Sequence, residues 1–248
     1  MMWKYGRKVI DALIKRWTER TPVRAELERR SEADSSRSDI RVFEVGLSAE
    51  RHGDYKQGTR NAAQEEEGAR LIAIAKANGL YVPREEWSNF GDRKRMPSGE
   101  SIVYLDEHGK RVVKVRNPFA KSAIKQMHAQ DAIYEHLIHN VLFPNTRYRF
   151  EGISEDADGV RIILSQTYIS KTFLPPTQES IDRYLIEGLG LNLENRYFYG
   201  NEFLAVTDVS ADGDNVLTDG ERLYFIDPII KLKASAVDVL NYYYGVLK

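Results

Sequence analysis

A lysine inside an apolar run is the first residue whose surroundings point to chemistry. Lys114 stands within Val112-Val113-Lys114-Val115, and its β-branched neighbours predict a buried strand. Because an unpaired ammonium group is costly to bury, Lys114 needs an anion. Glu135, which lies 21 positions further on in a predicted helix, is the candidate partner. Such a pair would hold the amine where it contacts nucleotide phosphates. The alternative is a lysine on an edge strand that points to water.

Two oxygen-bearing side chains flank a predicted hairpin later in the chain. Asn215 opens one short strand, Asp227 ends the next, and the turn Thr218-Asp219-Gly220 separates the two strands. The two outer ends of a hairpin lie on the same side, so an amide oxygen and a carboxylate converge there. This donor set suits Mg²⁺ that carries phosphate oxygens. Asp208, on the preceding loop, is placed to orient or deprotonate an attacking hydroxyl.

The same acidic loop allows a second interpretation. Asp208-x-Ser210-x-Asp212-Gly213 matches the first half of a calcium-binding EF-hand loop. However, the twelfth position is Asp219 rather than glutamate, and the following segment predicts a strand rather than a helix. A calcium-binding interaction protein is therefore kept as an alternative.

Three histidines lie on or near the predicted helix that carries Glu135. These are His128, His136 and His139, of which the last two share a helix face. A zinc site needs at least three convergent ligands with a supporting shell. We therefore expect surface histidines rather than a metal site.

Composition narrows the class of protein. The chain has 248 residues, no cysteine and a formal net charge of −1, so we expect no disulfides and no general attraction to nucleic acid. No apolar run is long enough to span a bilayer, and we expect a cytoplasmic protein. Residues 201–228 hold seven acidic side chains against one arginine, which is consistent with a bound divalent cation.

The chain divides into an extension and one α+β domain. Residues 1–62 predict a basic amphipathic helix over 2–20, followed by a flexible segment, and that helix is a candidate contact for a homodimer. The domain covers 63–248, with one lobe over 63–168 and another over 169–248. Its predicted helices are 64–78, 120–142, 177–187 and 235–247, and its predicted strands are 102–105, 111–116, 148–152, 160–168, 203–206, 215–217 and 223–226.

An ordered series of motifs resembles the protein-kinase-like superfamily, and in particular the compact kinase domains of polyvalent proteins in phages and mobile elements. The matching segments, in chain order, are Ala75–Leu80, Ser98–Tyr104, Lys114, Glu135, Leu164–Tyr168, Pro176–Gly190, Asp208, Asn215–Leu217 and Ile226–Pro228. The resemblance covers about residues 64–232. It implies a minimal two-lobe kinase-like fold with a truncated C-terminal lobe, preceded by the N-terminal helical extension.

The resemblance also implies an activity, which is ATP- and Mg²⁺-dependent phosphoryl transfer to an unknown protein or small-molecule acceptor. Lys114 would contact the nucleotide phosphates and Glu135 would orient it, while backbone amides near Gly99 would cover the phosphates. Gln166 to Tyr168 would run beside the adenine. Asp208 would act as the base with Asp212 in reserve, and Asn215 and Asp227 would hold the metal.

The chain departs from the usual kinase pattern at the base. Kinases place the catalytic aspartate five positions before the metal-binding asparagine, whereas Asp208 lies seven before Asn215. Either the loop carries two extra residues, or Asp212 or Asp214 is the base. A pseudokinase, meaning a nucleotide-binding scaffold without turnover, is the resulting alternative. Pro228 replaces the aromatic residue that usually follows the metal-binding aspartate, and recognition of a protein substrate is not implied.

Overall fold

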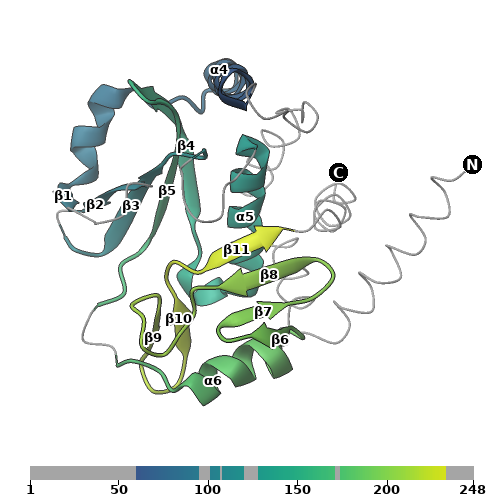
Figure 1. Cartoon of the computed structure of the whole chain (residues 1–248). Coiled ribbons are helices and arrows are strands. Elements are labelled where there is room, and N and C mark those ends of the chain that lie inside the picture. Colours follow the sequence, from purple (N-terminus) through teal and green to yellow (C-terminus); the bar gives the residue numbers. More distant parts are fainter. Residues whose placement is uncertain (1–59, 95–100, 107, 120–127, 171–173, 233–248) are drawn as a thin grey trace, which may run out of the picture. The chain divides into compact units, whose positions relative to one another are not determined.

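The computed structural model of the chain describes residues 60–94, 101–106, 108–119, 128–170 and 174–232 (Figure 1). The predicted helices over 2–20 and 235–247 lie outside these residues, as does Gly99. The described residues fall into two compact units. The first unit comprises the described residues up to Leu137 together with Arg147–Tyr168, and the second comprises Ile138–Thr146 and the described residues from Ile169 onward.

A five-stranded antiparallel sheet is the centre of the first unit. Its strand order is β1-β2-β3-β5-β4, as Figure 1 shows. The strands are β1 (Asp92–Lys94), β2 (Ser101–Leu105), β3 (Arg111–Arg116), β4 (Arg149–Asp156) and β5 (Gly159–Thr167). The predicted strands 102–105 and 111–116 are confirmed as β2 and β3, which pair as a hairpin with Val103 opposite Lys114. β4 is longer than predicted because its pairing with β5 continues to the turn at Asp156 and Gly159.

The two faces of this sheet differ in character because side chains alternate along each strand. Val113 and Val115 of β3 are buried in an apolar cluster with Trp87, Tyr104 and Ile163. Trp87 comes from the short 3-10 helix η1 (Arg84–Phe90), which the sequence pattern did not predict. The opposite face of β3 therefore carries Lys114 and Arg116.

Helix α4 (Arg60–Ala77) precedes the sheet and confirms the helix predicted from residue 64. Leu71 and Ala75 are fully buried. The helix ends at the predicted stop, where Gly79 has φ 66°, a left-handed conformation that glycine adopts without a Cβ penalty. Leu80 then donates its N–H to the Ala75 carbonyl at 2.9 Å, which closes the helix end.

Helix α5 (Ala129–Leu142) covers the later part of the predicted helix 120–142, and residues 120–127 lie outside the described ranges. His128 is not helical, so an uninterrupted helix across that position is wrong. The physical reason lies on α4, where the buried carboxylate of Glu67 accepts a hydrogen bond from the Ala129 N–H at 2.7 Å. A helix leaves its first N–H groups without partners inside the helix, and this carboxylate satisfies one of them.

The second unit combines short helices with two small sheets. Thr177 caps α6 by accepting a hydrogen bond from the Ser180 N–H at 3.2 Å. Phe225 stacks on Phe143, with ring centroids 4.3 Å apart, and anchors the interior. The elements are η2 (Pro144–Thr146), α6 (Gln178–Arg183), η3 (Tyr184–Gly188), a sheet in the order β11-β8-β7-β6, and the hairpin of β9 and β10. Their strands are β6 (Asn192–Asn195), β7 (Phe198–Gly200), β8 (Leu204–Thr207), β9 (Val216–Thr218), β10 (Leu223–Phe225) and β11 (Ile229–Leu232).

The mixture of helices and antiparallel sheets confirms the predicted α+β class. Within the described ranges, no helix has the length and apolar character that crossing a bilayer requires.

Candidate functional site

Lys114 is buried in the middle of the first unit's sheet. β3 lies between β2 and β5, so the alternative of a water-facing lysine on an edge strand is wrong. The side chain is 9% exposed, and its Nζ donates a hydrogen bond to the Tyr148 hydroxyl at 2.8 Å. The same Nζ lies 5.1 Å from the centroid of the Tyr148 ring. The hydroxyl and the π face therefore both stabilise the buried charge.

Glu135 on α5 contacts a cation of β3. Its Oε2 lies 3.3 Å from the guanidinium of Arg116, and the glutamate side chain is largely buried. Arg116 is two residues beyond Lys114, so both cations project from the same face of the strand. The sequence prediction named Glu135 with Lys114 and did not name Arg116. The two-residue spacing was the signal that could have added Arg116 to the site.

Tyr148 is a second residue that the sequence prediction missed. It is buried beside Lys114, and the His136 ring packs edge-on against it at 5.5 Å between centroids. His136 in turn contacts the Ala132 carbonyl, which fixes its ring within α5. Tyr148 lies 34 residues from Lys114 in sequence, so local patterns could not connect the two side chains.

The expectation of surface histidines is wrong. His128, His136 and His139 are only 7%, 6% and 3% exposed. His128 Nδ1 lies 3.4 Å from Glu67, and His139 Nε2 is 3.3 Å from the Phe225 carbonyl. α5 is covered on several sides, which a single amphipathic stripe does not predict. Among the residues that the structure describes, no cluster of three or more His, Cys, Asp or Glu side chains could hold a metal ion.

Gln166 shares the sheet face of Lys114. It is opposite Val112 in the β3–β5 ladder, and directly opposed residues project to the same face. Gln166 is buried, as is Val103 on the neighbouring strand. Tyr168 follows β5 and is exposed, while its N–H donates to the Lys110 carbonyl at 2.8 Å. This face therefore combines an ammonium group, an amide and apolar side chains.

In the second unit, Asp208 and Asn215 are in direct contact. The Asn215 Nδ2 donates to the Asp208 carboxylate at 2.7 Å and to the Asp208 carbonyl at 3.2 Å. Asp208 has φ 62°, a left-handed conformation that is uncommon outside glycine and that requires support from neighbouring groups. The seven-residue spacing therefore does not separate the two side chains.

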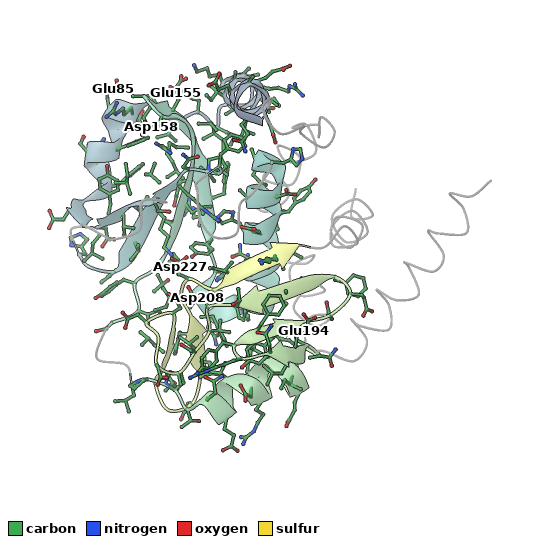
Figure 2. All side chains as sticks on the ribbon, viewed as in Figure 1. Glu85, Glu155, Asp158, Glu194, Asp208 and Asp227 are labelled. Carbon is green, nitrogen blue, oxygen red and sulfur yellow. The ribbon has the colours of Figure 1, made fainter. Side chains whose placement is uncertain are left out.

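Asp227 lies at the same hairpin end as Asn215. β9 and β10 pair antiparallel, and the ladder extends through a hydrogen bond from the Ile226 N–H to the Asn215 carbonyl at 2.8 Å. Asp227 is the next residue, and its side chain is exposed. Figure 2 shows Asp208 and Asp227 in one region of the second unit. The loop and the hairpin end thus present two carboxylates and an amide.

Asp212 and Asp214 lie on the same loop and are both exposed. The negative charge of Asp212 attracts the guanidinium of Arg196, which lies in the turn between β6 and β7. The pKa of that guanidinium is raised first by its hydrogen bond to Tyr197 and more weakly by Asp212. Within the described loop, the Asn215 side chain donates its hydrogen bonds to Asp208.

The chain carries a strand lysine, an acidic residue on the next helix, an Asp–Asn loop and an acidic hairpin end, in the order that the resemblance to kinases predicts. A sequence model of the serine/threonine/tyrosine kinases found in polyvalent proteins matches residues 64–234. The match covers more than half of the 248 residues, and the chain belongs to this family. No curated protein and no solved structure gave a match.

Proposed function

We propose that the chain is a phosphotransferase that moves the γ-phosphoryl group of ATP to a hydroxyl group of a protein or small-molecule acceptor. The bond between the γ-phosphorus and its bridging oxygen breaks, a bond to the acceptor oxygen forms, and ADP leaves. The acceptor's proton goes to the Asp208 carboxylate. The observation that carries this proposal is the direct hydrogen bond between Asp208 and Asn215 in a chain of a kinase family.

In the first unit, Lys114 would contact the nucleotide phosphates. Tyr148 restrains its amine from one side, which supports a fixed position for the charge. Glu135 would keep the cations of β3 in place through α5, and its contact with Arg116 supports that role. Val103 and Gln166, on the same face, would adjoin the adenine together with Tyr168. A two-lobe kinase-like arrangement is part of this proposal.

In the second unit, Asn215 and Asp227 would hold Mg²⁺. The donor set fits this ion, because carboxylate and amide oxygens are its preferred protein ligands. The Asn215 amide nitrogen already bonds Asp208, which leaves Oδ1 as the atom for the metal. Mg²⁺ would neutralise charge on the phosphates, while Asp208 orients the attacking hydroxyl and takes its proton.

A nucleotide-binding scaffold without turnover is the second candidate. The seven-residue separation of Asp208 and Asn215 favours it, because kinases use five. Both candidates share the nucleotide site and differ only in chemistry. A homodimer through residues 2–20 and a cytoplasmic location stay predictions.

Thermal unfolding with ATP tests the nucleotide site. ATP with Mg²⁺ at a hundredfold excess over its dissociation constant should stabilise the wild type by about 2.7 kcal/mol. Lys114→Met keeps the length and packing of the side chain without its charge, and Asp227→Asn keeps the shape of the carboxylate. Each variant should lose most of the stabilisation.

Glu179→Ala, an exposed position on α6, is the control and should respond as the wild type does. An equal shift in all four proteins, or stabilisation that is independent of Mg²⁺, would contradict the proposed site.

A further inference from the structure

The loop between Asp208 and Asn215 is fastened at its middle by a side chain of α6. The Ala211 N–H donates to Oε1 of Gln178 at 3.0 Å. Within the loop, Val209 is fully buried, and the Gly213 N–H donates to the Ser210 carbonyl at 3.2 Å. This loop is two residues longer than the usual kinase spacing. A hydrogen bond from Gln178, outside the loop, holds its middle.

The orientation of Gln178 is fixed by the other end of its amide. Its Nε2 donates to Asp182 Oδ1 at 2.8 Å and to the Tyr199 hydroxyl oxygen at 2.8 Å. Tyr199 donates its own proton to Asp182 at 2.5 Å. A flipped amide would place Oε1 against the Asp182 carboxylate and NH₂ against the Ala211 N–H, and both contacts are repulsive. Only one orientation therefore satisfies every partner.

The surroundings make this network rigid. Tyr199 is 1% exposed, and its burial followed by the hydrogen bond to Asp182 raises the pKa of its hydroxyl above the ordinary value. The hydroxyl therefore stays a proton donor at neutral pH. Gln178 is the first residue of α6, directly after the N-cap Thr177, so its backbone is also held. Networks with every group satisfied specify one geometry.

We infer that Gln178 is a positioning residue for the base, with Asp182 and Tyr199 as its support. This inference rests on the proposed function. Asp208 has a strained backbone at φ 62°, and such a conformation persists only where neighbouring contacts over-determine it. The Gln178 contact holds the loop at Ala211, and the Asn215 contact holds its start at Asp208. Gln178 thereby offsets the effect of the longer loop.

Gln178→Met tests this role, because methionine has a similar length and lacks the amide. Glu179→Ala, the neighbouring exposed position on α6, is the matched control. The readouts are hydrogen exchange of peptides that cover 209–215 in the full chain, and the kinetics of phosphoryl transfer from ATP with Mg²⁺. We expect exchange in the loop to rise about fivefold, as expected when one hydrogen bond is lost. We expect kcat to fall about tenfold with KM for ATP within about twofold of wild type.

Three results would overturn the inference: unchanged exchange in the loop, an equal rise in exchange across α6 and β7, or a rise in KM with unchanged kcat. If Gln178→Met does not fold, Gln178→Asn, which keeps the polar group but is too short to reach, replaces it in both measurements. Should the wild type show no transfer at all, the proposed function fails, and the exchange measurement still decides whether Gln178 fixes the loop.

Discussion

The buried ammonium of Lys114 shows what a single position in this chain requires. The apolar strand around it indicated burial and left a water-facing edge position as the alternative, and the structure confirms the burial. Tyr148 and Arg116 escaped prediction for different reasons. Tyr148 is distant from Lys114 in sequence, and only the fold brings the two side chains together. Arg116 lies two residues after Lys114 in β3, so the alternation of side chains along the strand places both on one face, where Arg116 pairs with Glu135. A single contact between two residues that are distant in sequence leaves no periodic pattern along the chain.

Replacing Tyr148 by phenylalanine isolates the hydroxyl. The ring stays in contact with Lys114 and His136, but the hydrogen bond to a charged group is lost, so the free energy of unfolding should fall by about 1.5–3 kcal/mol. Urea denaturation measures this change. Tyr168→Phe, at an exposed position, should alter stability by less than about 0.5 kcal/mol. Equal effects of the two substitutions would show that the Tyr148 hydroxyl does not stabilise the buried lysine.

Tyr199 gives a prediction at alkaline pH. Burial and the Asp182 carboxylate raise the pKa of its hydroxyl, so the folded protein keeps this proton where the unfolded chain releases it. Its contribution is therefore complete below about pH 10, the ordinary tyrosine value, and is lost as the pH rises further. The stability advantage of wild type over Tyr199→Phe should shrink by about 1.4 kcal/mol per pH unit above pH 10. Parallel stability curves for the two proteins between pH 9 and pH 11 would contradict this.

At the scale of elements, sequence patterns predicted those strands and helices that bury an apolar face. β2, β3, β5 and α4 are examples. β6 was missed because all four of its residues are exposed, so it carries no alternation and is held by its pairing with β7. η1 was missed because Trp87 is its only buried residue. The start of α5 depends on Glu67, which lies 62 residues earlier and so leaves no local capping signal.

Glu67 is buried, and it should contribute more to stability than a solvent-exposed glutamate on a helix. Its carboxylate is 4% exposed and contacts both Ala129 and His128. Glu67→Ala should lower the free energy of unfolding by about 1–3 kcal/mol, because a buried N–H loses its cap. The neighbouring Glu66, which pairs with Arg70 at the surface, is the control, and Glu66→Ala should cost less than about 1 kcal/mol. Chemical denaturation compares the two, and a smaller loss for Glu67→Ala would refute the capping role.

On the scale of the whole molecule, the chain distributes its chemical groups over two units. Lys114 and Glu135 belong to the first, and Asp208, Asn215 and Asp227 to the second. The order of these residues along the chain gave the resemblance to kinases, and the match over residues 64–234 confirms the family. The sequence predicted Asp208 as the base and left Asp212 and Asp214 as alternatives. The hydrogen bond from Asn215 supports Asp208 as the proposed base. The rates of phosphoryl transfer by variants at positions 208 and 212 test this choice.

The most direct measurement uses radiolabelled ATP with Mg²⁺ and follows label on the chain itself and in released phosphate. We expect magnesium-dependent turnover by the wild type, a loss of about 10²-fold or more in Asp208→Asn, and near wild-type rates in Asp212→Asn. Asparagine at position 208 still accepts a hydrogen bond from Asn215, so the loop is preserved while the base is removed. Bound ATP without any turnover in the wild type, or turnover that survives Asp208→Asn, would contradict the account.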